Sequence, residues 1–342
     1  MKNPTISDVA TLAGVSKSTV SAVLNNKNVT REATRRAVLR AIEELNYRPS
    51  RSARRGFRPV SGKSIAFIAK ESQNPYYAEI LAGIVAVAQK QGYLVSMNSS
   101  ERQYRVEHEI VEQCMEREVT GLIITPTIHD DVDLSHLFEL KRHNIPFVLL
   151  EDVRGVRASL VDVDNVIASY QAVRYLIEHG HSSIVHFGGP VYSQHSQERI
   201  EGVRRAFSES HLKFTDDTVV PTGDSPEKGY ETALQHFREH ARNLPTAVTC
   251  YNDLVAIGVL TALRELGIAV PEEVSVIGFD DLDILRFFPQ RLTTVRVPKY
   301  EMGYRAAELL IRQIESHGEH QPEKVALPAE LVIRETTRAL DS

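Results

Sequence analysis

Residues 5–24 read TISDVATLAGVSKSTVSAVL, and their spacing predicts two short helices joined by a tight turn. Thr5 and Asp8 fit a capping box at the start of the first helix. Gly14 stands where a helix end favours a left-handed residue, and Ser16 is a suitable N-cap for the second helix. Apolar residues at helical spacing give each segment one buried face: Ile6, Val9, Ala10 and Ala13, then Val20, Val23 and Leu24.

A third helix is predicted between Thr30, its N-cap, and Pro49, which ends it. Its apolar residues follow the i, i+3, i+4, i+7 spacing: Val38, Ala41, Ile42 and Leu45. Two short helices joined by a turn with glycine, and a third helix packed across them, form a helix-turn-helix. The second helix of such a unit enters the major groove of DNA, where base edges can be distinguished. The alternative is a three-helix surface cap that binds no DNA.

The distribution of charge supports the DNA-binding interpretation. Residues 1–60 hold twelve Lys or Arg against four Asp or Glu, although the whole chain has a net charge of −5. A basic N-terminal segment on an acidic body indicates that the segment, and not the body, meets a polyanion. An ordinary solvated surface is the alternative that charge alone leaves open.

From Lys63 onward, short apolar stretches alternate with amphipathic ones. Strands are predicted at Ser64–Ala69, Leu94–Met97, Gly121–Thr125, Phe147–Leu150, Leu160–Val163, Ser183–Phe187, Thr218–Val220, Ala247–Cys250, Val274–Gly278 and around Leu331–Ile333. Helices are predicted at Tyr77–Gln91, Arg105–Glu118, Leu134–His143, Val166–His179, Gln194–Glu209, Glu227–Glu239 and Leu254–Leu266. This alternation is typical of parallel, doubly wound α/β sheets, and two such series predict two lobes.

Several classes of protein are not indicated. The chain has no apolar run long enough to span a membrane and no signal-peptide pattern, so we expect a cytoplasmic, nucleoid-associated protein. Cys114 and Cys250 lie far apart and form no metal or redox motif, so both are expected to be buried and reduced. We find no nucleophile elbow, P-loop or metalloprotease motif. The sequence therefore predicts no enzyme, no cofactor and no metal.

Polar residues cluster where the predicted strands end. Facing lobes bind ligands in the cleft at the carboxyl ends of their strands. The residues expected there are Tyr76, Tyr77, Thr125, Glu151, Asp152, Asn252, Asp253 and Asp280, with Arg199 from a nearby helix and Tyr76, Phe287 or Phe288 as the aromatic partner. Carboxylates and amides beside an arginine suit a ligand rich in hydroxyls, which both donate and accept. Asp281 and Asp283 are expected to be solvated or to cap a helix.

Several stretches of the sequence form a recognisable series of motifs. In the first 50 residues these are Thr5–Ala10, Ala13–Ser16, Thr19–Ser21, Val23–Asn25 and Leu45–Ser50. Further along they are Asn74–Tyr77, Ile177–His181, Gly188–Pro190, Tyr251–Asp253, Gly278–Asp281 and Leu292–Val295. In these motifs the chain resembles the LacI/GalR family of bacterial repressors, and the resemblance runs the full length of the chain. It implies a helix-turn-helix domain joined to a two-lobed body like that of periplasmic binding proteins.

The resemblance also assigns roles within the first 62 residues. Lys17, Ser18 and Ala22 match positions that select operator bases, and Ala22 can only offer a methyl group to thymine. The other DNA-binding positions it implies are Thr5, Ser7, Ser16, Thr19, Ser21, Asn25, Tyr47, Arg51, Arg54 and Arg55. Residues 50–62 resemble a hinge helix that wedges an apolar side chain into the minor groove. Gly56 falls at the wedge position and Phe57 follows it, so either the aromatic ring substitutes or the segment is a plain linker.

In the body, the resemblance matches Arg199 and Asp280 to a pair that grips the effector in sugar and purine repressors. A structural ion pair is the alternative for Arg199. We predict a repressor of a catabolic operon that binds a pseudo-palindromic operator as a homodimer, with its affinity changed by a small effector, preferably a sugar or sugar derivative. A sugar acid and a nucleoside base stay open, as does the direction of regulation. A transport protein and an enzyme on the same scaffold are the rival functions.

The predicted domains are residues 1–49 for the helix-turn-helix, 50–62 for the hinge and 63–342 for the body. The first lobe is expected to hold about residues 63–160 and 293–322. The second lobe is expected to hold about residues 161–292 and 323–342. The chain ends soon after the last predicted strand without a leucine-rich segment, which favours a dimer over a tetramer.

Overall fold

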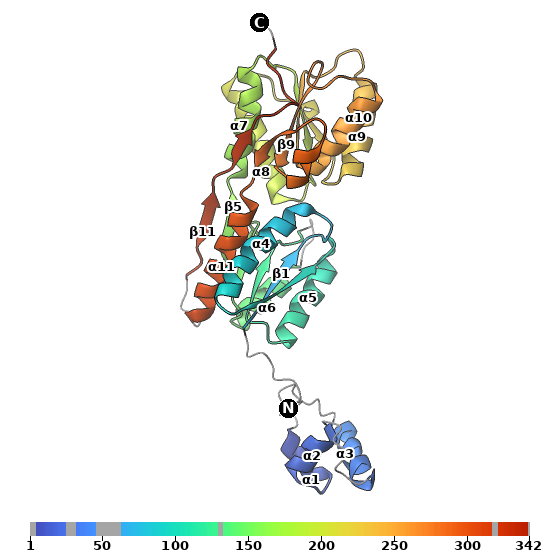
Figure 1. Ribbon diagram of the computed structural model, residues 1–342, viewed down its shortest axis with the longest axis vertical. Helices are drawn as coiled ribbons and strands as arrows, with labels where there is room; N and C mark the ends of the chain where they lie inside the picture. The colour runs from blue at the N-terminus through green and yellow to red at the C-terminus, as the bar shows by residue number, and fades with distance from the viewer. Residues whose placement is uncertain (1–4, 25–31, 46–62, 129–132, 317–320, 341–342) are drawn as a thin grey trace. The chain divides into compact units, whose positions relative to one another are not determined.

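The computed structural model describes residues 5–24, 32–45, 63–128, 133–316 and 321–340. The chain divides into two compact units, Met1–Gly62 and Lys63–Ser342 (Figure 1). In the described residues no helix is long and apolar enough to cross a membrane. Both cysteines are buried and unpaired, as the sequence predicts.

The first unit contains the three predicted helices, α1 (Ile6–Leu12), α2 (Lys17–Leu24) and α3 (Glu32–Glu44). The carboxylate of Asp8 accepts hydrogen bonds from the backbone N–H and the hydroxyl of Thr5, both at 2.7 Å. Gly14 has a φ of 66°, a left-handed conformation that favours glycine after a helix. Ser16 Oγ accepts from Thr19 N at 3.2 Å and so caps α2. The helices meet around a small core of Val9, Ala10, Val20, Val23, Val38 and Ala41.

The second unit begins with an all-parallel sheet in the order β11-β5-β4-β3-β1-β2. Its strands are β1 (Ser64–Ala69), β2 (Leu94–Ser99), β3 (Gly121–Ile124), β4 (Phe147–Leu149), β5 (Ser159–Val163) and β11 (Lys324–Leu327). Helices α4 (Pro75–Lys90) and α11 (Lys299–Glu315) cover one face, and α5 (Tyr104–Glu116) and α6 (Ser135–Arg142) cover the other. The strands are apolar on both faces because each face carries helices. We call this layered body the first lobe.

The second lobe has the strand order β12-β10-β9-β8-β6-β7, parallel except for β12. Its strands are β6 (Ile184–Gly188), β7 (Val219–Pro221), β8 (Ala247–Cys250), β9 (Ser275–Asp280), β10 (Thr293–Arg296) and β12 (Glu330–Val332). Helices α7 (Asn165–Glu178) and α8 (Gln194–Glu209) pack on one face, and α9 (Pro226–Glu239) and α10 (Asp253–Glu265) on the other. Two short 3₁₀ helices, η2 (Asp216–Thr218) and η3 (Asp283–Phe287), complete it.

The chain crosses between the lobes after β5, β10 and β11, and these crossings correct the predicted lobe boundaries. Strand β5 pairs with β4, so the first lobe runs to Val163 and not to about residue 160. Strand β10 pairs with β9 in the second lobe, although the residues from 293 to 322 were predicted to belong to the first lobe. Strand β11 pairs with β5 in the first lobe, although residues from 323 were expected in the second. The reason is that strand pairing is a long-range choice that local pattern does not encode.

Helix α11, which is not among the helices predicted from sequence, packs closely against α4. A Cβ atom on Gly83 would lie 2.0 Å from the carbonyl oxygen of Tyr300, and one on Gly303 would lie 1.9 Å from that of Ile80. Only glycine permits this approach of two backbones. The two helices therefore form a stiff pair, and the residues at their N-termini, which lie near the second lobe, hold fixed positions in the first.

Candidate ligand-binding cleft

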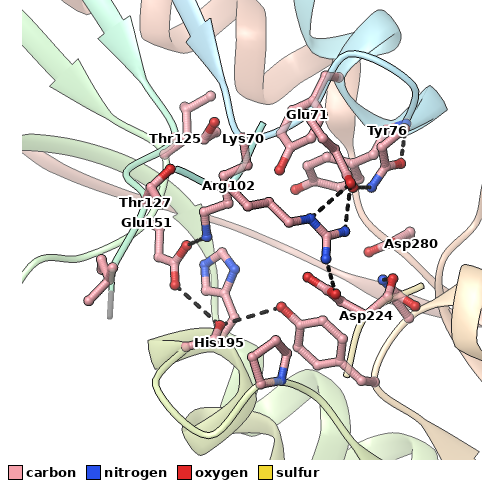
Figure 2. Close-up of a pocket in the computed structure, with 18 of the residues that line it drawn as sticks. Lys70, Glu71, Tyr76, Arg102, Thr125, Thr127, Glu151, His195, Asp224 and Asp280 are labelled. Atoms are coloured by element: carbon pink, nitrogen blue, oxygen red, sulfur yellow. Dashed lines mark hydrogen bonds and ion pairs between the residues drawn. The ribbon is translucent and has the colours of Figure 1, made fainter. Parts of the chain in front are cut away.

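A cleft of about 850 Å³ lies between the carboxyl edges of the two sheets. Its walls come from the residues that follow the strands, as expected for parallel α/β sheets. Lys70 follows β1, Thr125 follows β3 and Glu151 lies just after β4 on the side of the first lobe. On the side of the second lobe, Asn252 lies just after β8 and Asp280 ends β9. Figure 2 shows Lys70, Thr125, Glu151 and Asp280 around one space.

The wall from the first lobe is built on an ion pair between Lys70 and Glu151. The Glu151 side chain is 2% exposed. Burial by itself raises the pKa of Glu151, but the positive charges of Lys70 and His195 outweigh it and bring the pKa to about 2. The pKa of Lys70 is raised above its usual value, because the Glu151 carboxylate outweighs the effect of burial. Both groups are therefore charged and mutually satisfied at neutral pH.

A second pair joins the lobes beside this wall. His195 Nε2, from the first turn of α8, lies 2.7 Å from the Asp162 carboxylate on β5. Burial lowers the pKa of His195, but the carboxylates of Asp162 and Glu151 raise it further, so the net shift is upward. The imidazole therefore already has a partner in the first lobe, the Asp162 carboxylate.

The wall from the second lobe centres on Arg199 of α8, which is 5% exposed. Its Nε donates to Asn165 Oδ1 at 3.1 Å, and its Nη1 donates to the carbonyl oxygen of Tyr251. The guanidinium lies over two aromatic rings, 3.6 Å from the ring centre of Phe279 and 4.7 Å from that of Tyr251. Cation–π contact and fixed hydrogen bonds hold one face of this arginine before any ligand arrives.

Asp280 presents a different environment from Glu151. It is 5% exposed, and its carboxylate has no hydrogen-bond partner among the described residues. Burial raises the pKa of Asp280, and the charges of Arg199 and Lys299 offset only part of this effect. The backbone there has a φ of 120°, and Lys299 Nζ donates to the carbonyl oxygens of Asp280 and Asp281 at 2.6 and 2.9 Å. The lysine holds the strained backbone that aims the carboxylate at the cleft.

An arginine from the first lobe spans the mouth of the cleft. Arg102 donates to Glu71 Oε2 from Nη2 at 2.6 Å and from Nε at 2.9 Å, and it forms an ion pair with Asp224 of the second lobe (Figure 2). Glu101 and Arg102 both have positive φ values, 45° and 58°, which turn the chain after β2 toward the cleft. This triad links the two lobes on the side opposite the chain crossings near His195.

Seven of the ten effector residues predicted from sequence line this cleft. They are Tyr76, Tyr77, Thr125, Glu151, Arg199, Asn252 and Asp280. The Tyr76 hydroxyl contacts Met302 Sδ at 3.7 Å, and its ring meets that of Tyr77 edge to face. Thr125 Oγ1 donates to the carbonyl oxygen of Ile68, and the Asn252 carboxamide caps α10 while donating to the Asp224 carbonyl oxygen.

The other three predicted residues lie outside the cleft. Asp152 accepts from Lys324 Nζ at 2.9 Å on the surface. Asp253 is fully buried beneath the cleft, where it accepts from Thr294 Oγ1 at 2.6 Å and Leu282 N at 2.8 Å. Phe287 lies in η3 with 83% of its surface exposed, and Phe288 also stays outside. In the two adjacent pairs Glu151–Asp152 and Asn252–Asp253, only the first residue lines the cleft.

Asp281 also corrects the sequence interpretation. It is 2% exposed and accepts from Arg296 Nε at 2.7 Å and Arg334 Nη2 at 2.6 Å, so it is neither solvated nor a helix cap. The sequence reasoning missed several cleft residues: Lys70, Glu71, Arg102, His195, Asp224 and Tyr251. Lys70, Glu71 and Tyr251 directly follow strands, so extending the carboxyl-end rule to every polar residue would have found them.

The predicted DNA-reading residues lie on or next to α2. Ser16, Lys17 and Ser18 are exposed at its N-terminal end, and Thr19 and Ala22 are half-buried. Ser16 Oγ lies 2.7 Å from Ser18 Oγ and 2.9 Å from Thr19 Oγ1. Thr5 is exposed and Ser7 half-buried at the start of α1. The remaining predictions fall outside the described residues or side chains: Ser21, Asn25, Tyr47, Arg51, Arg54, Arg55, Gly56 and Phe57.

A helix-turn-helix unit in one chain with a two-lobed ligand-binding body defines a ligand-responsive DNA-binding regulator. Comparison with known proteins identifies the class more closely. Residues 5–50 match the family described as bacterial regulatory proteins, lacI family. Residues 173–337 match the periplasmic binding protein-like domain. The HTH-type transcriptional repressor PurR of Vibrio parahaemolyticus is 33% identical over 341 residues, which cover 98% of this chain and 99% of that protein.

Two solved structures extend the match. A complex of the transcriptional regulator CelR with cellobiose is 29% identical with a TM-score of 0.73, covering 97% of this chain and 99% of that one. The Lac repressor dimer bound to operator and the anti-inducer ONPF is 25% identical with a TM-score of 0.71, covering 98% and 99%. The chain belongs to the LacI family. It is a ligand-responsive, DNA-binding transcriptional repressor and not an enzyme.

Proposed function

We propose that this repressor binds a pseudo-palindromic operator as a homodimer and that a sugar or sugar derivative, bound between the lobes, changes its operator affinity. The observation that carries the effector assignment is that the Asp280 carboxylate and the Arg199 guanidinium both line the cleft. The buried carboxylate has no partner among the described residues, and the arginine beside it is held in place by Asn165 and by the Tyr251 backbone. A carboxylate that lines the cleft and has no partner in the described protein can accept a hydrogen bond from a ligand hydroxyl, and a hydrogen bond to a charged group contributes ~1.5–3 kcal/mol.

The chemistry of the cleft favours a hydroxyl-rich ligand. A sugar hydroxyl donates to one group and accepts from another, so adjacent hydroxyls can bridge Asp280 and Arg199. The ring of Tyr76 lines the same space and offers an apolar surface to the C–H face of a sugar. The likeness to the CelR–cellobiose complex supports this class of ligand, and control of a catabolic operon follows as the corresponding biological role.

The cleft and the operator site are coupled through the arrangement of the lobes. A ligand that contacts both walls favours one interlobe arrangement, and in a dimer this arrangement sets the relative position of the two operator-binding units. Binding free energies of effector and operator are then reciprocally linked. The direction of regulation is set by which arrangement binds the operator, and the experiment below measures it directly.

In the DNA-binding unit, we assign base recognition to Lys17, Ser18 and Ala22 on α2. Lys17 and Ser18 are exposed at the end of the helix that enters the major groove in helix-turn-helix proteins. Ser7 and Thr19 are assigned to phosphate contacts, which set the register of the protein on the duplex. The half-buried methyl group of Ala22 favours a thymine at its position over a guanine.

The test combines ligand binding and operator binding by the full-length chain. A thermal-shift screen of sugars and their derivatives is followed by fluorescence anisotropy with operator DNA, with and without each ligand that binds. A ligand present at 100 times its Kd should add about 2.7 kcal/mol of stability. We expect Arg199→Ala to abolish this shift. Arg204→Ala, an exposed arginine on the same helix, should leave it unchanged.

Two results would count against the proposal. If no ligand in the screen alters stability or operator binding, the cleft is not an effector site for this class. Lys228→Ala, which changes an exposed lysine of the body, is the control. If Lys17→Ala, like this control, binds operator and random DNA with unchanged affinity, α2 is not the helix that recognises bases. We expect Lys17→Ala to lose operator preference by about tenfold, because one good base contact is worth ~1–3 kcal/mol.

A further inference from the structure

The charges that line the cleft are already balanced within the protein. Among the described residues, three cations line it, Lys70, Arg102 and Arg199, together with the four carboxylates Glu71, Glu151, Asp224 and Asp280. His195 also lines it and is held by Asp162. An anionic ligand binds where a cation lacks a counter-charge, so the partners of each cation decide what the cleft can accept.

Two of the three cations form ion pairs with carboxylates of the cleft itself. Lys70 pairs with Glu151, whose side chain is almost completely buried. Arg102 contacts two carboxylates, Glu71 and Asp224, so the triad at the cleft mouth carries a net negative charge. An anion could reach either cation only by displacing a carboxylate that stays nearby and repels it.

The third cation is Arg199. Two of its donors are used by Asn165 and the Tyr251 carbonyl oxygen, and one face of its guanidinium lies on the Phe279 ring. Arg199 and Asp280 line the same cleft, and the positive charge of Arg199 lowers the pKa of Asp280, so the two groups interact electrostatically. Arg199 can therefore donate to a ligand hydroxyl, but any anion that it attracts must also approach Asp280.

Three helix N-termini also reach the cleft, and such termini attract anions. Each of them is capped by its own side chain. Asn74 Oδ1 accepts from Tyr76 N at 3.0 Å on α4, Ser193 Oγ accepts from Ser196 N at 3.4 Å on α8, and Asn252 Oδ1 accepts from Val255 N at 2.8 Å on α10. The positive ends of these helices instead stabilise the carboxylates that the protein has placed beside them.

We propose that the effector is an uncharged molecule that donates hydrogen bonds to Asp280, and that the cleft rejects sugar phosphates and sugar acids. This inference rests on the proposed function and narrows it, since a neutral sugar, a sugar acid and a nucleoside base all fit a polar cleft of this size. In the described part of the cleft, each of the three cations is paired with a carboxylate or interacts with one, so an incoming phosphate or carboxylate would meet a like charge. A neutral hydroxyl or ring N–H satisfies the lone carboxylate at no such cost.

The experiment uses matched ligand series with the full-length protein. Each series contains a neutral parent and its anionic derivatives: glucose with glucose phosphate and gluconate, galactose with galacturonate, ribose with ribose phosphate, and a nucleoside with its monophosphate. Thermal shift identifies the binding series, and calorimetry gives Kd for each member. We expect the anionic member to bind at least about 100-fold more weakly than its neutral parent, since it leaves a buried charge unpaired.

A variant supplies the converse test. Asp224→Asn keeps the shape of the side chain but removes one of the two carboxylates that hold Arg102, so binding of the anionic derivative should strengthen about tenfold or more. Glu231→Gln, which removes an exposed carboxylate paired with Lys228, is the matched control and should change nothing. Unchanged thermal unfolding of the ligand-free variants would show that both still fold.

The outcomes separate the two proposals. If a sugar phosphate or sugar acid binds the wild-type protein within tenfold of its neutral parent, the charge inference is overturned while the effector function stands. If Asp224→Asn leaves anion binding as weak as before, the argument from Arg102 is wrong. If no member of any series binds although the protein binds operator, the proposed effector function is wrong, and the proposed preference for an uncharged effector is wrong as well.

Discussion

Glu151 and Asp280 are two buried carboxylates at equivalent places in the two lobes, but they differ in their partners and in the direction in which their pKa values are shifted. Each lies at the carboxyl end of a parallel strand and lines the same cleft. Glu151 is paired with Lys70 of its own lobe, and its pKa falls to about 2. Asp280 has no such partner in the described residues, and burial raises its pKa. The environment, and not the residue type or the topology, decides what each group can do.

The difference assigns separate tasks to the two walls. Lys70 and Glu151 neutralise each other in an ion pair, so they form a rigid wall and contribute to the stability of the folded protein. No described group donates a hydrogen bond to the Asp280 carboxylate, so this side chain is available to bind a ligand, at some cost to the stability of the ligand-free protein. Four changes test this division, and they are ordered here by the size of the expected effect.

Removing the lysine from the first wall should give the largest effect. In Lys70→Met, Glu151 is left as a buried charge without its partner, and we expect a loss of about 3–5 kcal/mol in the free energy of unfolding. Urea denaturation of the ligand-free protein measures it. The double variant Lys70→Met with Glu151→Gln should recover most of the loss. A loss below about 1 kcal/mol in the single variant would mean that the pair is not the support of this wall.

Neutralising the acid of the second wall should change binding instead of stability. In Asp280→Asn we expect effector affinity to fall by about 10- to 100-fold, because a hydrogen bond to a charged group contributes ~1.5–3 kcal/mol. Asparagine tolerates the positive φ at this position, so the ligand-free protein should be at least as stable as the wild type at pH 7.5. Calorimetry and urea denaturation give the two quantities. A variant that is destabilised but binds normally would reverse the assignment.

Acidification should separate the two carboxylates without any mutation. The folded-state pKa of Asp280 is raised, so its contribution to stability is fully present below the unfolded pKa and is lost as the pH rises through the folded value. Effector donors favour the ionised form, so affinity should weaken as the pH falls from 7.5 to 5.5. The pKa of Glu151 is lowered to about 2, so its stability contribution is present above the unfolded value and is lost only in stronger acid. Calorimetry across this range checks the trend, and Asp280→Asn should flatten it.

The smallest effect is expected next to Glu151. Asp152 pairs with Lys324 on the surface, where their side chains are 43% and 66% exposed. Exposed pairs contribute about 0–1 kcal/mol, so Asp152→Asn should leave unfolding and effector affinity nearly unchanged. A loss of affinity comparable to that of Asp280→Asn would restore the sequence-based prediction that Asp152 contacts the effector.

The described parts of the molecule show how far local pattern reaches. Helix α8 was predicted at Gln194–Glu209 and strand β1 at Ser64–Ala69, and both have those bounds. The bounds of both elements could be predicted because apolar periodicity and helix caps act within a few residues. Helix α11 was missed, although it fixes the position of Lys299 at the second lobe. Its start at Lys299, after Pro298, has no side-chain cap, in contrast to the starts of α4, α7, α8, α9 and α10.

The candidate site divides in the same manner. The carboxyl-end rule located part of the cleft, because all strands of a parallel sheet deliver their ends to one edge. The rule could not decide which of two adjacent polar residues faces the cleft, so Asp152 and Asp253 were included with Glu151 and Asn252. Neighbouring residues in a chain direct their side chains differently, and tertiary packing decides which of the two side chains faces the cleft. Asp253 is drawn inward by Thr294 and the Leu282 amide.

By itself, the sequence determined the helix-turn-helix, the two α/β series, the family and the strand ends at which a ligand would bind. These properties depend on short-range periodicity and on motifs that can be read along the chain. Only the tertiary structure decided which lobe receives β5, β10 and β11, and which charges meet across the cleft. Lys70 and Glu151 are 81 positions apart, and Arg102 and Asp224 are 122 apart. Pairings over such separations depend on how whole layers pack, and therefore the balance of charge that selects the ligand is a property of the fold.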